Sequence, residues 1–449
     1  MSDESMKRIF KLIKPLLLSG LLFLIFQSFI ISFPNVLAEA FPSRIPLSAF
    51  PESESWPSDL QILEIHTPVF FKQKGYRSFD DFTDKEIQEI VGRGFNTLWI
   101  MGVWEESEFS RIIHQRRKDL PDGEVFGSKY AIPDYVLNKN LGDERSLREF
   151  VKRAKARGLR IMLDFIPNHR AIDSPLIDQH PEWFIHLKQA PKRSDAKSYF
   201  EHQLPDGTKI WVAYANGIYK GVPLTDLAQF NLFDPGALQH LLDSARNVAG
   251  LSGGGGLRID DLVSLFPQEY RARWYPHLSM KAFDQKIDQL CLQVFGQRPK
   301  HSGFVLEPVL ALIKKDHPDI KFFGETYREQ HQLWQDVGFD LTYNKLIFDR
   351  LVWGFRRDLD WMDFKDYVFG KGFHETTTRD YCFKSVYFLE NHDENKRIIQ
   401  RVKREFKKNE IDPRILDASK LLAACITTIP GVPMFYIGQI EGHLAAGPT

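Results

Sequence analysis

Three acidic side chains each follow a short apolar run that has the length of a β-strand. Asp260, Glu325 and Asp393 come after the runs 257–259, 322–324 and 387–389. If these runs are parallel strands of one barrel, the acids lie at the same end and converge on one pocket. Cleavage of a glycosidic bond needs such a set, because one carboxyl group attacks the sugar carbon and another protonates the leaving oxygen. Taken singly, each acid is better explained as a helix cap or a solvated loop residue.

Arg258 stands two residues before Asp260, so on a strand both side chains face the same side. A guanidinium there lowers the pKa of the Asp260 carboxyl and keeps it ionised, as a nucleophile requires. Glu325 has the opposite requirement, since it must hold a proton near neutral pH in an apolar or anionic environment. Phe322 and Phe323 are suitable apolar neighbours for it.

The elements that must position these acids alternate along the chain. Nearly continuous apolar runs are separated by segments of helical period, a pattern typical of a parallel sheet covered by helices. Thr83 begins a capping box, and Asp143 is placed to cap a helix whose apolar face includes Leu147 and Phe150. Eight strands predict an α/β fold, a (β/α)8 TIM barrel. The candidate strands are Gln61–His66, Asn96–Met101, Leu159–Leu163, Gly256–Asp260, Ile320–Gly324, Phe339–Tyr343, Val386–Leu389 and Val432–Ile437.

The stretch 170–231 is too long for an ordinary loop after the third strand. We therefore expect an inserted small domain over the mouth of a barrel formed by 61–169 and 232–449, after a Pro/Ser-rich linker at 41–60. Aromatic residues in an insert more often form a local core than a sugar platform. Here they include Trp183, Phe184, Tyr199, Trp211 and Tyr214.

The N-terminus carries basic residues from Lys7 to Lys14, followed by the apolar run 16–33. With small residues ending at Ala38, this pattern predicts an export signal within residues 1–40. The run is also just long enough to cross a bilayer, so the alternative is an uncleaved anchor at residues 15–34 that associates the chain with a membrane. Either way the remainder is expected outside the cytoplasm, in a periplasmic or extracellular location.

Charge and cysteine content exclude several classes of function. The 59 Lys and Arg residues balance 59 Asp and Glu residues, so no field favours nucleic acid as a partner. A neutral oligo- or polysaccharide is compatible with that balance. Cys291, Cys382 and Cys425 are too few and too scattered for a disulfide framework or a zinc site, and buried free thiols are expected.

Five short motifs together resemble the α-amylase superfamily, the glycoside hydrolase family 13-like catalytic domains. The resemblance runs over about residues 62–442. An Asn-His-Asp triplet alone is a weak signal, whereas five motifs in the family's order at plausible spacing are a strong one. The matching segments are Leu163–His169, Gly256–Asp260, Phe323–Glu325, Phe388–Asp393 and Gly431–Gln439.

The resemblance assigns roles to the convergent acids and to two histidines. It implies that Asp260 is the nucleophile and Glu325 the general acid/base, while Asp393 binds sugar hydroxyls and stabilises the distorted ring of the transition state. It also implies that His169 and His392 hydrogen-bond the sugar in the cleaved subsite. For both histidines, a satisfied core or rim position is the alternative.

Two further positions follow from the resemblance. Asp164 is expected to support the pocket through Arg258, and a purely structural carboxylate is nearly as well supported. Tyr130 matches a position of the family that stacks on the sugar ring. For Tyr130 the alternative is packing under the second βα loop.

No cofactor is required for this chemistry, but a structural metal is a separate question. In many relatives Asn168 and an acid of the inserted domain bind Ca²⁺, and Asp226 is the matching acid. Such a site needs several oxygen ligands. Relatives often place a histidine four residues after the nucleophile, and Ser264 stands there instead.

The resemblance implies retaining cleavage of α-1,4-glucosidic bonds in starch, glycogen or maltooligosaccharides. Two alternatives stay open: transglycosylation of α-glucans by the same residues, and a catalytically inactive glycan-binding homologue. Inactive relatives usually lose one or more of the carboxylates, and all three are present here. Relatives also continue with a last barrel helix and a C-terminal β-sandwich, and the sequence up to Thr449 predicts neither.

Overall fold

The computed structural model describes ten segments of the chain. They are residues 60–115, 127–216, 223–327, 330–345, 348, 381–394, 397–405, 410–411, 413–429 and 431–439. The predicted export signal or anchor at 1–40 and all of the predicted linker but Leu60 lie outside them, and both stay predictions. Within these segments, no helix combines the length and the apolar character needed to cross a bilayer.

Eight parallel strands close into a barrel in the order β1-β13-β12-β11-β10-β9-β3-β2. This confirms the (β/α)8 barrel, and the ends of the predicted strands differ from the observed ones by no more than two residues. Near-continuous burial of these strands explains why they could be recognised. The strands are β1 (Ile62–His66), β2 (Thr97–Met101), β3 (Arg160–Phe165), β9 (Gly256–Ile259), β10 (Lys321–Gly324), β11 (Leu341–Tyr343), β12 (Ser385–Tyr387) and β13 (Val432–Tyr436).

The register of three neighbouring strands positions the candidate site. Asp164 of β3 pairs with Arg258 of β9, and Ile259 of β9 pairs with Gly324 of β10. Pairing continues one residue further, since the backbone N–H of Asp260 donates to the carbonyl of Phe165 at 2.9 Å. The N–H of Glu325 donates in the same way to the carbonyl of Ile259, also at 2.9 Å. Asp260 and Glu325 therefore lie next to each other, directly after the C-terminal ends of β9 and β10.

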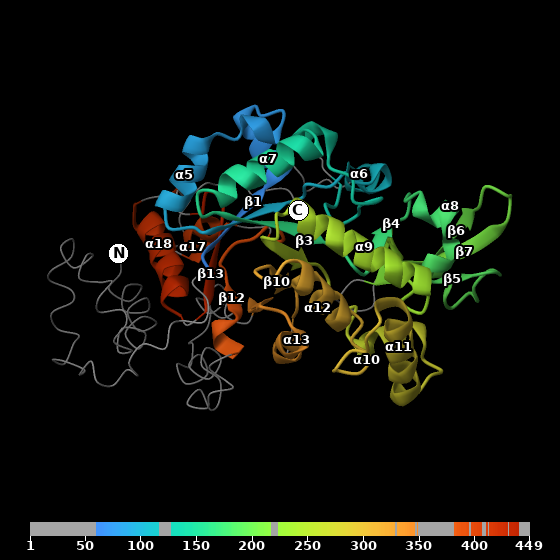
Figure 1. Ribbon diagram of the computed structural model, residues 1–449. Helices are drawn as coiled ribbons and strands as arrows, with labels where there is room; N and C mark the ends of the chain where they lie inside the picture. The colour runs from blue at the N-terminus through green and yellow to red at the C-terminus, as the bar shows by residue number, and fades with distance from the viewer. Residues whose placement is uncertain are drawn as a thin grey trace. The chain divides into compact units, whose positions relative to one another are not determined.

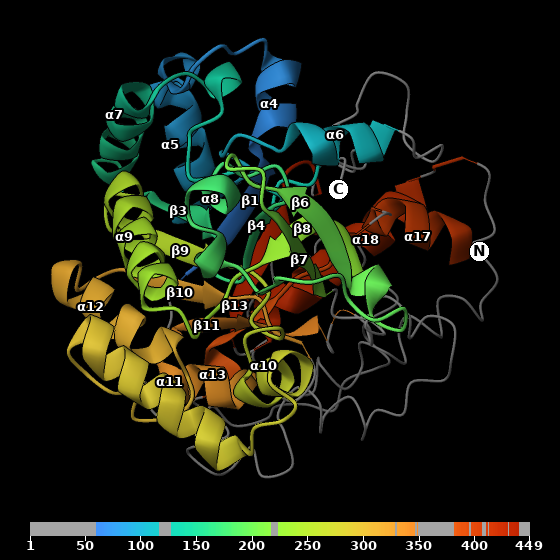
Figure 2. The same ribbon diagram turned by 90° about the vertical axis from the view of Figure 1, so that its right-hand side faces the viewer.

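Helices α5, α7, α9 and α12 follow one another around strands β3, β9 and β10 (Figure 2). The capping boxes predicted at Thr83 and Asp143 are present, each with its side chain accepting from the third helical N–H. Phe150 of α7 packs against Phe79 and Phe82, with ring centroids 5.3 and 4.8 Å apart. These helices and their neighbours are α4 (Thr67–Lys74), α5 (Asp84–Gly92), α6 (Glu108–Gln115), α7 (Glu144–Lys155), α9 (Pro235–Leu251), α10 (Pro267–Trp274), α11 (Met280–Phe295), α12 (Leu306–Asp316) and α13 (His331–Val337).

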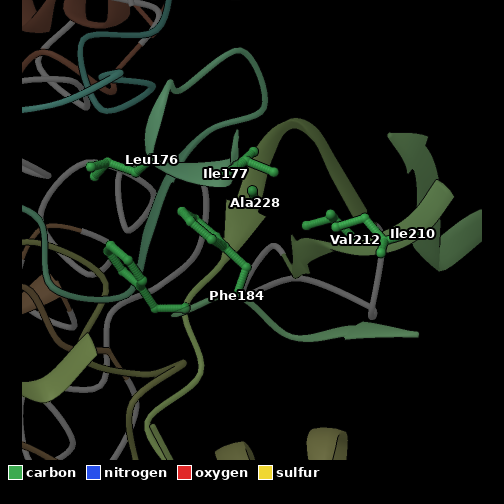
Figure 3. Packing of buried hydrophobic residues seen from close by; sticks show 7 residues of the cluster. Leu176, Ile177, Phe184, Ile210, Val212 and Ala228 are labelled. Carbon is green, nitrogen blue, oxygen red and sulfur yellow. The ribbon is translucent and has the colours of Figure 1, made fainter. Parts of the chain in front are cut away.

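A separate antiparallel sheet lies between β3 and α9 in the chain (Figure 1). It has the order β4-β8-β7-β5, with β6 also paired to β7. A small apolar core of its own holds it, in which Phe184 lies near Leu176 and Ile177 (Figure 3). Trp183 is stacked between His180 and His240, with centroids 3.9 and 4.9 Å away. The elements are β4 (His169–Ala171), α8 (Leu176–Gln179), β5 (His186–Leu187), β6 (Tyr199–Gln203), β7 (Lys209–Asn216) and β8 (Pro223–Gln229).

The chain divides into two compact units. The larger contains the described residues within 60–344, 390–397 and 434–439, and it holds every candidate site residue. In the smaller unit, helices α17 (Ile398–Glu405) and α18 (Pro413–Thr428) pack against each other. In the same unit, Val386 of β12 pairs with Val432 of β13.

Candidate active site

Arg258 lies between the two carboxyl groups that the sequence proposes for bond cleavage. Its side chain is buried; one terminal nitrogen lies 2.5 Å from an oxygen of Asp260 and the other 2.8 Å from an oxygen of Glu325. The faces of Trp99 and Tyr130 lie 5.2 and 5.0 Å from the guanidinium carbon. The expected contact between Arg258 and Asp260 is present, but the same guanidinium also forms an ion pair with Glu325.

Asp260 and Glu325 were expected to have a lowered and a raised pKa, respectively, and the directions in the structure are the opposite. Burial raises the pKa of Asp260 well above its usual range, and the neighbouring charge of Glu325 adds to that effect. Burial acts on Glu325 in the same direction, but Arg258 and several hydrogen bonds outweigh it and lower the pKa of Glu325 to about 2. The two carboxyls are in hydrogen-bonding contact, so they titrate as a pair with one shared proton. Burial and the charge of Glu325 favour the protonated form of Asp260.

Two donors hold the Glu325 carboxylate from outside the pair. The Tyr327 hydroxyl donates to one oxygen at 2.6 Å, and the backbone N–H of Asp261 donates to the other at 3.1 Å. Asp261 has a φ of +48°, a left-handed conformation that Asp and Asn tolerate better than most side chains. Burial raises the pKa of Asp261 to about 7.

His392 links the third predicted acid to the barrel wall. Its Nδ1 lies 2.6 Å from Glu64 of β1, its Nε2 lies 2.9 Å from the Tyr130 hydroxyl, and Asp393 is 3.3 Å from the same Nε2. Burial lowers the pKa of His392, but the charges of Asp393 and Glu64 outweigh it and raise the value to about 9. The imidazole is therefore charged at neutral pH. The Asp393 side chain remains 45% exposed and open to a ligand.

His169 lies beside the proposed nucleophile, with its Nε2 3.9 Å from an oxygen of Asp260. The ring is 2% exposed, and burial together with the nearby Arg170 lowers its pKa to about 3. His169 is therefore neutral at physiological pH. A neutral imidazole there is available as a hydrogen-bond partner for a sugar hydroxyl.

Asp164 is fully buried, but its hydrogen-bond partners differ from the expected one. The Trp99 indole N–H and the backbone N–H of Gly102 each donate to it at 2.9 Å. Arg258 makes its ion pairs with the carboxyls of Asp260 and Glu325 instead. Asp164 thus joins the end of β3 to Trp99 and Gly102 at the end of β2. Its interaction with Arg258 is electrostatic.

The oxygen atoms around Asn168 do not fit a calcium cage. Its side-chain oxygen accepts from the Gln229 amide at 2.8 Å, and its side-chain nitrogen donates to Asp261 at 3.2 Å. Asp226, the predicted second ligand, accepts instead from the Ser110 hydroxyl at 2.7 Å. Over the segments that the structure describes, no three His, Cys, Asp or Glu side chains gather in a way that could hold a metal.

Four residues of the site escaped the sequence reasoning: Glu64, Asp261, Gln229 and Tyr327. Asp261 and Tyr327 are close to Asp260 and Glu325 in sequence, and their polar character beside a proposed catalytic acid was a usable signal. Glu64 was visible as a lone charge within the first apolar run. Gln229 had no local signal, because its role depends on the pairing of β8 with β4.

Comparison with known proteins identifies the family of the chain. The family described as alpha amylase, catalytic domain, matches residues 86–446. Alpha-amylase 2 of Dictyoglomus thermophilum is 22% identical over 79% of this chain and 48% of its own length. The alpha-amylase of Streptomyces lividans is 20% identical over 81% of this chain and 40% of its own length. The chain thus spans about half the length of the curated relatives it matches.

Solved structures show the same fold at low sequence identity. The alpha-amylase of Geobacillus thermoleovorans, solved in complex with acarbose, is 17% identical with a TM-score of 0.54. That match covers 88% of this chain and 73% of the other. Since the catalytic-domain family covers most of the sequence and the barrel matches its solved relatives, the chain belongs to the α-amylase family of catalytic domains, within glycoside hydrolase family 13.

Proposed function

We propose that this chain is a retaining glycoside hydrolase that cleaves α-1,4-glucosidic bonds. The observation that carries the proposal is the pair Asp260 and Glu325, joined to one guanidinium at the ends of adjacent strands. Retaining enzymes hold their two carboxyls about 5 Å apart, whereas inverting enzymes leave room between them for a water molecule. Two carboxyls that bind the two terminal nitrogens of one guanidinium fit the shorter, retaining separation.

The shared proton gives the pair a defined starting state. Transfer of this proton along the hydrogen bond from Asp260 to Glu325 produces an anionic nucleophile and a neutral acid in one step. Asp260 then attacks the anomeric carbon while Glu325 protonates the leaving oxygen, and a covalent glycosyl-enzyme forms. In the second half, Glu325 takes a proton from the attacking water, and the sugar leaves Asp260 with its original configuration.

The surrounding side chains have roles in binding under the same proposal. The Nε2 of His169, which has no hydrogen-bond partner among the described residues, bonds a sugar hydroxyl beside Asp260. The charged His392 donates one ring N–H to Glu64 and directs the other toward Tyr130 and Asp393, so it orients these two side chains around the sugar. Asp393, which is exposed, binds hydroxyls of the distorted ring, and Tyr130 presents its ring beside them. The names of the relatives support an α-glucan as substrate, since they include alpha-amylases, a maltogenic alpha-amylase and a cyclomaltodextrinase.

The test is a product profile from maltoheptaose, followed by anomeric NMR, for wild type, Asp260→Asn and Glu325→Gln. Loss of the general acid is expected to lower kcat about 10²- to 10⁴-fold, and loss of the nucleophile at least as much. Glu201→Gln, an exposed acid on β6, is the matched control and should keep full activity. Equal activity in all four proteins would refute the proposal. An inverted initial product would exclude double displacement, and products longer than the substrate would identify a transferase.

A further inference from the structure

We propose that a hydrogen-bonded chain, Gln229–Asn168–Asp261, replaces a structural calcium ion and positions the reactive carboxyl pair. This inference rests on the proposed function. It names two positioning residues, Gln229 and Asp261, and it predicts that the site is assembled without a divalent cation. The chain runs from the antiparallel sheet to the strand ends of the barrel.

The first link is the Gln229 side chain at the end of β8. Its amide nitrogen lies 2.9 Å from the backbone oxygen of Asn168, 2.8 Å from the side-chain oxygen of Asn168 and 3.4 Å from the backbone oxygen of Phe230. The residue is 1% exposed. Three oxygens thus converge on one buried point, whereas Ca²⁺ takes about 6–8 oxygen ligands. Here an amide NH2 group occupies that point and satisfies them with hydrogen bonds.

The second link is the Asn168 side chain, which uses both ends of its amide. The oxygen accepts from Gln229, and the nitrogen donates to a carboxylate oxygen of Asp261 at 3.2 Å. Asn168 is fully buried. Buried polar groups rarely remain without partners, so this pairing fixes the amide in a single orientation. Asn168 therefore connects the end of β8 to the turn that follows β9 through two hydrogen bonds.

The third link is Asp261, the residue directly after the proposed nucleophile. Its second carboxylate oxygen accepts from the backbone N–H of Ser264 at 3.2 Å, and its own N–H donates to Glu325 at 3.1 Å. Its left-handed backbone conformation costs energy for a residue with a Cβ and persists only where the surroundings impose it. The contacts with Asn168 and Ser264 impose it here. Asp261 thus orients Glu325 directly and Asp260 through the chain.

The acid expected to complete a calcium site is engaged elsewhere. Asp226 accepts from the hydroxyl of Ser110, and its backbone oxygen accepts from the N–H of Ile172. The backbone N–H of Ser264 donates to Asp261, so one oxygen of that carboxylate is also engaged. The polar groups that face Asn168 are consequently donors as well as acceptors, and a cation would displace the Gln229 amide.

The experiment measures thermal unfolding of the wild-type chain in EDTA and in excess CaCl2, together with kcat and KM. The wild-type Tm and kcat are expected to be the same in both. Gln229→Ala should lower Tm by ~2–6 °C and lower kcat about 10- to 100-fold with a smaller change in KM, because the carboxyl pair is displaced. Gln229→Glu points carboxylate oxygens at those of Asn168, and excess calcium should restore part of its lost Tm. Gln239→Glu, on the exposed face of α9, is the matched control. Its Tm should change with neither EDTA nor calcium.

Two outcomes would overturn the inference. One is a wild-type Tm that falls in EDTA and recovers with calcium, a measurement that needs no variant and no activity. The other is a Gln229→Ala protein with wild-type Tm and kcat. Failure of the proposed function is distinguishable, because it would appear as absent glycosidase activity in the wild type while the calcium response of Tm remained measurable.

Discussion

Replacement of Glu64 by Gln is expected to remove a pH-dependent part of the protein's stability. Glu64 is fully buried and accepts from His392 twice, from Nδ1 at 2.6 Å and from the backbone N–H at 3.2 Å. Burial alone would lower the pKa of His392, and the charges of Asp393 and Glu64 raise it to about 9. In the unfolded chain the same group titrates at about 6.5.

The magnitude and sign follow from these two values. Below about pH 6.5 His392 is protonated in the folded and the unfolded chain, and the pair contributes its full stabilisation. Between that pH and about 9 only the folded chain keeps the proton, so stability falls by about 1.4 kcal/mol per pH unit, or ~3 kcal/mol in all. That total is an upper bound, because burial also raises the pKa of Glu64, and this cost offsets part of the gain.

The assay is urea unfolding across this pH range for wild type and Glu64→Gln. In the variant, only Asp393 still opposes the effect of burial on the pKa of His392, so the decline of stability with pH should flatten. The two proteins should differ by ~2–3 kcal/mol near pH 6 and converge above pH 9. Glu201→Gln, which breaks an exposed pair with Lys209, should leave the profile unchanged. Parallel profiles for wild type and Glu64→Gln would refute the assignment of this charge pair.

Three further substitutions test the packing and capping that support the site. Thr83→Ala removes the cap of α5 and should lower the free energy of unfolding by ~1 kcal/mol in urea titration; no loss would mean that the box is not formed. Phe150→Ala removes the ring that packs against Phe79 and Phe82 and should lower the free energy of unfolding by ~3–5 kcal/mol. A Tm near that of the wild type would contradict this packing. Trp99→Phe deletes one of the two donors to Asp164 and should cost ~1.5–3 kcal/mol by calorimetry, and an unchanged Tm would contradict that bond.

The barrel was predictable because its signal is local. Each strand is a short apolar run buried on both faces, so its length and composition identify it without knowledge of its neighbours. The caps at Thr83 and Asp143 depend only on residues three positions away. The contact between Arg258 and Asp260 was predictable for the same reason, since two residues on one strand share a side.

The predicted ionised state of Asp260 does not agree with the direction of its pKa, because that pKa depends on a contact between neighbouring strands. Arg258 lowers the pKa of Asp260 as expected, but burial and the charge of Glu325, which shares the same guanidinium, outweigh it. Glu64 and His392 lie 328 positions apart, and no local pattern joins them. The partners of Asp164 were missed because an indole from β2 reaches it across the barrel wall.

Closure of the barrel has a consequence for self-association. A ring of strands has no free edge, so the buried strands of the barrel offer no row of unpaired backbone groups to another copy. Exposed strand edges within the described residues belong to the small antiparallel sheet, where β4 has three residues and β5 only two. The longer strand β6 carries Glu201 and His202 rather than a continuous apolar run. Aggregation by strand addition is therefore resisted at both places, by topology in the barrel and by short or charged edges in the sheet.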